Sequence, residues 1–320
     1  MSILPVNPEF FCSRSFIFLF FWTSVTVALS QQPPIPFQFS TDDYQHFTSN
    51  YQGERFADGR PKVSKDILER MKLVTIEEAW SVLREHGYSC QFDQGWVMTH
   101  ENPVLVGRAV TCSFLPYRPD IAEVIVEDGK KNNFTGRDKH WVMQQLVEDD
   151  VIVVDLFGKK VGAGFVGDNL ANLIQQKTGT GMVVDGGCRD LAGVMELDNF
   201  VVFNRNWHPA TSSAYDKSMV IGMNLPIRIG EAAVLPGDVV LGLREGVIFI
   251  PAHLALEVVE TSEVVRLKDE FGFQRLREGK YTGGQIDTKW TTPIQQDFKD
   301  WIEKRNIRLS DFQEKLITDF

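Results

Sequence analysis

The sequence predicts an α/β fold built on one mixed sheet, with an extension at each end. Apolar, β-branched runs alternate with helical segments in the middle of the chain, and the part that follows is rich in strands. This order favours a single α/β domain over two independent domains. With 320 residues, 43% of them hydrophobic, the chain is long enough to bury a large core. We expect a signal peptide (1–30), an N-terminal arm (31–63), the α/β domain (64–280) and a C-terminal helical extension (281–320).

The first thirty residues have the pattern of a signal peptide. Arg14 precedes an apolar stretch from Phe16 to Leu29, and small residues end it before Gln31. The stretch is shorter than the roughly 20 apolar residues that a transmembrane helix needs, although a retained anchor is the alternative. The segment before the apolar stretch is unusually long and contains the acidic Glu9, so a later translation start is an alternative. We therefore predict an exported protein, periplasmic or secreted, with no membrane contact after the signal is removed.

Charge and cysteine content exclude several classes of function. The net charge is −10, and removing residues 1–30 takes away one acid and one base, so it stays −10. Nucleic-acid binding needs a basic face, so no nucleic-acid partner is expected. Cys12 lies in the expected signal peptide and would be removed with it. The remaining Cys90, Cys112 and Cys188 show no zinc spacing, and a Cys90–Cys112 disulfide is left open.

The elements of the domain follow one another with recognisable boundaries. Thr75 to Glu78 has the form of a capping box, and the helix that it begins should stop near Gly87. Apolar runs predict strands and charged amphipathic segments predict helices. The expected strands are 104–114, 151–157, 182–185 and 200–206, followed by two more in 234–251 around Gly246; the expected helices are 120–131, 138–147, 169–177, 252–278 and a tail from Pro293.

The segment GDNLANLIQQKTGTGMVVDGGCRD carries charge at both ends. A helix rises about 1.5 Å per residue and a strand about 3.3 Å, so the helix from Asn169 to Lys177 and the strand that returns from Met182 both cover roughly 15 Å. Asp168 and the pair Arg189–Asp190 should therefore meet at one edge of the sheet, although twenty residues separate Asp168 from Arg189. This edge, at the carboxyl ends of strands, is where open α/β proteins place ligands.

The segment admits two other interpretations. GAGFVG, ending at Gly167, matches a dinucleotide loop with Asp185 as the ribose-binding acid. However, residues 158–161 separate it from the strand, and Asp168 would repel a pyrophosphate. Alternatively, Asp168 and Asp190 only cap helices and Arg189 pairs with one of them. Convergence of two acids, an arginine and the glycines at 186 and 187, which let a ligand approach the backbone, favours a site.

The motif Asp168-x20-Arg189-Asp190, preceded by glycine in GDNL, resembles the RraA-like superfamily, as do GMVVDGGCRD and PGDVV…GVIFIP over roughly 65–280. This superfamily includes class II 4-hydroxy-4-methyl-2-oxoglutarate aldolases, which also decarboxylate oxaloacetate, and the regulator of ribonuclease E activity. The resemblance implies a swivelling β/β/α sandwich, assembled as a homotrimer or hexamer with sites between subunits. It implies a lyase that acts on a small 2-oxo acid. The alternative functions are a noncatalytic binding or regulatory protein on the same scaffold and a dinucleotide-dependent oxidoreductase.

The resemblance also assigns roles to residues. It implies Mg²⁺ or Mn²⁺ held by Asp190 and waters, which is normal for Mg²⁺. The substrate would contact Arg189 and the segment Gly167, Asp168, Asn169 and Leu170, whose amides can bind a carboxylate at a helix start. Asp168 would position a water as proton carrier, and the metal and Arg189 would stabilise the enolate formed when the carbon–carbon bond breaks.

Some positions depart from the family pattern. Gly193 stands where the aldolase motif often has an acid, and Leu243 stands for the usual aspartate between the last two strands. Because of these two departures, the resemblance does not identify the particular substrate or the residue that transfers the proton. Family aldolases also use an acid from a neighbouring subunit, for which Glu263, Glu270 and Glu278 are candidates. His208 is a weaker candidate for the pocket, and Cys188 is expected to be a packing residue.

Overall fold

The computed structural model describes residues 37–136, 138–210 and 217–318. They belong to one compact unit. The expected signal peptide lies outside the described residues. None of the helices within the described ranges is both long and apolar enough to cross a membrane.

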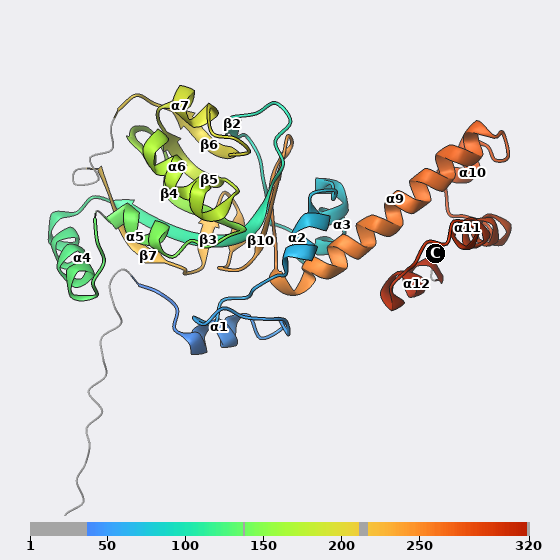
Figure 1. Cartoon of the computed structure of the whole chain (residues 1–320), viewed down its shortest axis with the longest axis horizontal. Coiled ribbons are helices and arrows are strands. Elements are labelled where there is room, and N and C mark those ends of the chain that lie inside the picture. Colours follow the sequence, from blue (N-terminus) through green and yellow to red (C-terminus); the bar gives the residue numbers. More distant parts are fainter. Residues whose placement is uncertain (1–36, 137, 211–216, 319–320) are drawn as a thin grey trace, which may run out of the picture. The chain divides into compact units, whose positions relative to one another are not determined.

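The centre of the molecule is a nine-stranded mixed sheet with the order β1-β11-β10-β3-β4-β5-β6-β2, and β7 pairs with β3 (Figure 1). The pairs β3–β4, β4–β5 and β5–β6 are parallel and the other pairs are antiparallel. This confirms the predicted α/β class. The strands are β1 Phe92–Asp93, β2 Val97–Met98, β3 Leu105–Pro116, β4 Asp150–Gly164, β5 Met182–Cys188, β6 Val202–Trp207, β7 Ser218–Met223, β10 Val239–Leu243 and β11 Gly246–Ile250, with a separate hairpin of β8 Ile227–Ile229 and β9 Ala232–Val234.

The helices begin and end where local chemistry allows. In the predicted capping box, the Thr75 hydroxyl accepts the Glu78 N–H at 3.2 Å and the Thr75 N–H donates to the Glu78 carboxylate at 2.8 Å. Gly87 follows with a φ of 84°, which halts the helix. The helices are α1 Thr41–Phe47, α2 Lys65–Met71, α3 Ile76–Glu85, α4 Pro119–Lys131, α5 Asp138–Gln144, α6 Asp168–Thr178, α7 Leu191–Met195, the 3-10 turn η1 Ala252–Leu254, α9 Ala255–Arg277, α10 Gly283–Ile286, α11 Thr292–Lys304 and α12 Asp311–Thr318.

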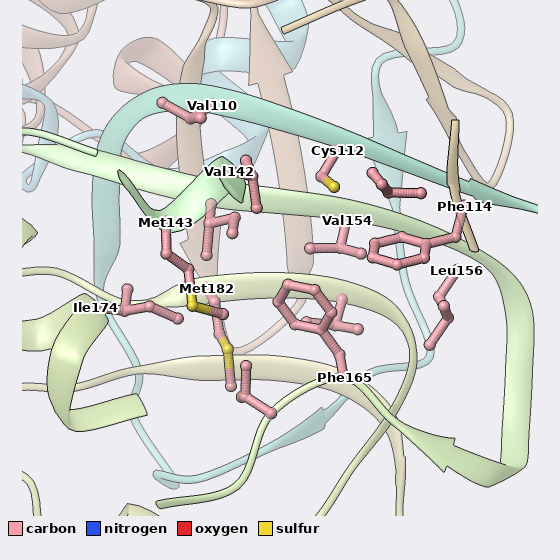
Figure 2. Close-up of a cluster of buried hydrophobic side chains, with 14 of the residues drawn as sticks. Val110, Cys112, Phe114, Val142, Met143, Val154, Leu156, Phe165, Ile174 and Met182 are labelled. Carbon is pink, nitrogen blue, oxygen red and sulfur yellow. The ribbon is translucent and has the colours of Figure 1, made fainter. Parts of the chain in front are cut away.

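Alternate residues of the central strands feed two different cores. On one face, Val110, Val154 and Met182 belong to one cluster with Val142 and Met143 of α5 and Ile174 of α6 (Figure 2). On the other face, Val153 and Val183 pack with the β8–β9 hairpin. Both faces of β4 and β5 are therefore buried, as expected of parallel strands with continuous apolar sequence.

Helices α2, α3 and the first turns of α9 form a third core over β10 and β11. The last part of α9 belongs to a fourth core with α11 and α12, centred on Phe271, Phe298 and Trp301. The arm before α2 joins the domain through its backbone, because the Phe37 N–H donates to Ile221 and its carbonyl accepts from Met223, both at 2.9 Å.

Strand β4 is longer than predicted. Its pairing with β5 is regular from Ile152 to Asp155 and then shifts twice, at Lys159 and at Gly164. The regular part agrees with the predicted strand at 151–157, because Phe157 and Gly158 have positive φ values of 43° and 66° that interrupt the extended backbone there. The later pairings of Lys159 and Gly164 with β5 depend on the partner strand, which local sequence does not show.

Candidate active site

The two charged ends of the segment meet at one edge of the sheet, as predicted. The chain leaves β4 at Gly164, enters α6 at Asp168, and returns along β5 to Arg189. Backbone hydrogen bonds join the two approaches: the Phe165 N–H donates to Gly187 at 2.8 Å, and the Arg189 N–H donates to Val166 at 3.1 Å. These bonds hold the start of α6 beside the end of β5.

Gly167 makes the close approach possible. A Cβ added to it would lie 2.2 Å from Oδ2 of Asp190 and 2.9 Å from Cζ of Arg189. Any side chain at this position would displace both groups. Asp190 and Arg189 therefore lie directly over the glycine that precedes Asp168.

Arg189 and Asp190 form an ion pair, with 2.8 Å between Nη1 and Oδ2, and each side chain is about one-third exposed, at 32%. Asp190 has φ 59° and ψ 42°, a left-handed conformation that costs a non-glycine residue energy. It is the N-cap residue of α7, but its side chain makes no capping hydrogen bond. The carboxylate is turned to the ion pair and to solvent instead.

Asp168 is the first residue of α6, and Gly167 is the N-cap. The alternative that Asp168 is the N-cap was therefore wrong. Its Oδ1 accepts the Asn169 N–H at 2.7 Å, so that amide reaches a substrate carboxylate only if Asp168 turns away. Leu170 is half-buried and packs on the core beneath the sheet. On its other side, Asp168 contacts Gly193 of α7.

Three neighbouring residues complete the surroundings. The backbone N–H of His208 donates to the Cys188 carbonyl at 2.8 Å, which places the His208 backbone beside the end of β5. The Lys139 ammonium donates to the Phe165 carbonyl at 3.3 Å. Cys188 is fully buried, and burial raises the pKa of its thiol to about 12. A thiol in this state is a packing group rather than a nucleophile.

The acids of this edge fit a hard divalent cation that keeps most of its waters. Asp190 and Asp168 offer carboxylate oxygens, the ligands that Mg²⁺ and Mn²⁺ prefer. Over the described ranges, no three His, Cys, Asp or Glu side chains cluster closely enough to form a metal cage. A cation here would share the Asp190 carboxylate with Arg189. This donor set does not suit zinc, which takes nitrogen and sulfur ligands from several side chains.

The dinucleotide interpretation lacks its expected parts. Gly162 and Gly164 belong to β4 rather than to a tight strand–helix turn. Asp185 pairs with Arg205 at 2.7 Å, and Arg205 also reaches Asp93 at 2.6 Å. The ribose-binding acid of that hypothesis is thus held in a structural ion-pair network.

Other predicted features lie elsewhere or serve packing. Gly186 leaves room for Leu156 rather than for a ligand, since an added Cβ would lie 2.6 Å from its Cδ2. Leu243 ends β10 and packs on the core under α2 and α3. The acids proposed as donors to a neighbouring subunit are engaged within the chain: Glu263 with Arg70, Glu270 with Arg305 and Glu278 with Arg275.

Two features of this edge were not predicted from the sequence. The left-handed backbone of Asp190 depends on how α7 leaves β5, and the contact of Gly193 with Asp168 depends on how α7 meets α6. The only available sign of the second was a glycine inside a short helix, where alanine is normally preferred.

Comparison with known proteins agrees with this geometry. Residues 68–249 match the RraA-like family, described as Aldolase/RraA. A Halalkalibacterium halodurans protein provisionally named 4-hydroxy-4-methyl-2-oxoglutarate aldolase is 31% identical over 128 residues, which cover 40% of this chain and 59% of that protein. An uncharacterized Methanocaldococcus jannaschii protein is 28% identical over 137 residues, 42% of this chain and 64% of that one. The chain thus spans less than two-thirds of these relatives.

Among solved structures, Streptomyces coelicolor RraAS2, described as an unusual member of the RNase ES inhibitor RraA protein family, matches with a TM-score of 0.56 and 24% identity. The match covers 70% of this chain and 100% of that one, and it shows a shared fold. The family match extends over more than half of the 320 residues and includes Asp168, Arg189 and Asp190. The chain therefore belongs to the RraA-like (Aldolase/RraA) family.

Proposed function

We propose that the protein is a divalent-metal-dependent carbon–carbon lyase acting on a small 2-oxo acid, by retro-aldol cleavage or by decarboxylation. The observation that carries the proposal is the convergence of Asp168 with the Arg189–Asp190 pair over Gly167. The related protein provisionally named as an aldolase supports the same class of reaction.

Asp190 and water would hold Mg²⁺ or Mn²⁺, which supplies positive charge to the carboxylate and keto oxygens of the substrate. The Arg189 guanidinium lies beside Asp190 and would stabilise the negative charge that develops on the keto oxygen as the carbon–carbon bond breaks. This stabilisation works best if the arginine is already in place, and its pairing with Asp190 orients it before substrate arrives.

Asp168 would move the proton through a positioned water. In retro-aldol cleavage the C4 hydroxyl loses a proton while the electron pair of the C3–C4 bond passes to C3, which must then be protonated to give pyruvate. A carboxylate held by the Asn169 N–H at 2.7 Å is a fixed acceptor for such a water. In oxaloacetate decarboxylation only the second proton transfer is needed, because carbon dioxide leaves without one.

We also propose that the protein works as a homotrimer or hexamer with the site near a subunit boundary. Leu191 and Met195 of α7 are 37% and 54% exposed next to the Arg189–Asp190 pair, and a neighbouring subunit would cover them. Light scattering after size exclusion measures this directly, and a monomer would contradict it.

The test is pyruvate release from oxaloacetate and from 4-hydroxy-4-methyl-2-oxoglutarate, with Mg²⁺ or Mn²⁺ and with chelator. Asp190→Ala and Arg189→Ala should each lower kcat/KM by roughly 100-fold or more. Asp198→Ala is the matched control, since Asp198 is an exposed acid beyond α7. If no pyruvate forms, or metal and both residues prove irrelevant, the lyase proposal fails and a noncatalytic role on this scaffold is favoured. A nicotinamide-dependent absorbance change would instead support the oxidoreductase.

A further inference from the structure

Gly193 and Asp168 lie against each other where α6 and α7 begin. A Cβ added to Gly193 would lie 2.9 Å from both Cβ and Oδ2 of Asp168, and 3.3 Å from its Cγ. Gly193 is in the middle of α7 and has no positive φ, so its backbone conformation is one that alanine also adopts. The close approach of Asp168 is what requires glycine here.

The Asp168 carboxylate is confined from two sides. Oδ1 accepts the Asn169 N–H at 2.7 Å, and Oδ2 lies on the side of Gly193. Rotation of the Asp168 side chain would move Oδ2 away from a new methyl group but would leave the Cβ of Asp168 in place. A methyl group at residue 193 can therefore be accommodated only if the first turns of the two helices separate.

The contact has a counterpart in the same site. Gly167 lies under the side chains of Asp190 and Arg189, while Gly193 lies beside Asp168. Each acid thus rests on a glycine of the other segment. The counterpart differs in one respect: Gly167 is approached by the mobile ends of side chains, whereas Gly193 is approached by a Cβ that is fixed to the backbone.

We propose that Gly193 is a positioning residue for Asp168. Its missing side chain lets α7 approach α6, and this approach fixes where the Asp168 carboxylate meets the substrate and its water. The catalytic consequence rests on the lyase function proposed above, whereas the packing contact does not.

The first experiment compares Gly193→Ala with Gly284→Ala in the full chain. Gly284 is also helical and has no atom within 4 Å of its added Cβ, so the control should keep wild-type melting temperature and activity. Gly193→Ala should lower the melting temperature by several degrees. It should lower kcat by roughly 10- to 100-fold, the range expected for a misplaced catalytic group, with KM and the Mn²⁺ dissociation constant within about threefold of wild type.

The division between kcat and binding separates positioning from general damage. If the Mn²⁺ dissociation constant rises as much as kcat falls, Gly193 acts through Asp190 and the proposal is overturned. Wild-type kcat and melting temperature in Gly193→Ala would overturn it as well.

A second measurement uses stability alone. Asp168→Gly removes the Cβ and carboxylate that Gly193 faces, so in that background Gly193→Ala should no longer lower the melting temperature. An equal loss in both backgrounds would mean that the contact is not responsible. If the melting temperatures are coupled but wild type releases no pyruvate, the lyase proposal fails while the placement of Asp168 by Gly193 stands.

Discussion

Arg60 of the N-terminal arm holds Asp150 at the start of β4 through two hydrogen bonds of 3.0 and 3.1 Å. The side chains are 3% and 0% exposed. Arg108 of β3 contacts the same carboxylate at 3.4 Å, and the Phe56 ring lies 4.3 Å from the Arg60 guanidinium. The arm lies outside the family match at 68–249, yet it supplies half of a buried charge pair at the start of β4.

Removing this partner should destabilise the whole domain. We expect Arg60→Ala to lower the free energy of unfolding by about 3–5 kcal/mol, because a buried carboxylate loses its main counter-charge. Lys65→Ala is the control: Lys65 and Glu148 pair at 2.6 Å but are 60% and 72% exposed, and the loss should be about 1 kcal/mol or less. Urea denaturation measures both free energies of unfolding. Equal losses would show that the buried Arg60 stabilises the domain no more than the exposed Lys65 does.

Gly167→Ala should damage cation binding while leaving the fold intact. The atoms nearest to its Cβ would be the flexible ends of Asp190 and Arg189, which can swing aside. We expect Mn²⁺ affinity to fall by roughly 10- to 100-fold, the usual cost of misorienting a metal ligand, with an unchanged melting temperature. Gly283→Ala, in open space, is the control. Wild-type Mn²⁺ affinity in Gly167→Ala would argue against Asp190 as the ligand.

Asp238 should give the protein an unusual dependence on pH. Burial raises the pKa of its carboxyl to about 7, although hydrogen bonds from the Leu235 and Ala252 amides oppose the shift. Between about pH 4 and pH 7 the folded state keeps a proton on Asp238 that the unfolded state releases. The contribution of Asp238 to the free energy of unfolding is therefore fully present below about pH 4 and is lost as pH rises towards 7. The stability difference between wild type and Asp238→Asn should therefore fall across this window in urea titrations. A difference that grows with pH would contradict the raised pKa.

The cysteines should differ sharply in reactivity. Cys90 is an exposed free cysteine, whereas Cys112 and Cys188 are buried. An aromatic disulfide reagent should react quickly with Cys90 in the native protein and with the buried pair only after denaturation. Cys90→Ser should lower the fast-reacting fraction by one thiol. If the fast fraction is unchanged, Cys90 is protected by another subunit or is oxidised.

We propose that residues 1–30 direct export, so the mature chain should begin at Gln31. N-terminal sequencing of the protein recovered from the medium or periplasm would show this. Recovery of an uncleaved chain from membranes would favour a retained anchor, the alternative that the apolar stretch leaves open.

Local patterns were enough to predict the meeting of Asp168 with Arg189. A helix of α6's length and the strand that returns from it cover similar distances. The rise per residue of a helix and of a strand therefore places Asp168 and Arg189 at the same edge of the sheet. The capping box at Thr75 was predictable for the same reason: its hydrogen bonds join residues three apart.

Contacts between distant segments could not be predicted in this way. Gly186 makes room for Leu156, and Glu263 pairs with Arg70 from the other end of the domain, so neither is free for the role assigned from sequence. Nothing within a few residues of Gly186 or Glu263 indicates these partners.

By itself, the sequence determined the α/β class, the order of most elements and which charged residues share an edge, because these follow from short-range periodicity and chain direction. Only the tertiary structure decided which atoms of that edge touch. The ion pair of Arg189 with Asp190, the left-handed backbone of Asp190 and the glycines under each acid all arise from the distance between α6, α7 and the end of β5. That distance is set by close packing of two helix starts, which no single segment encodes.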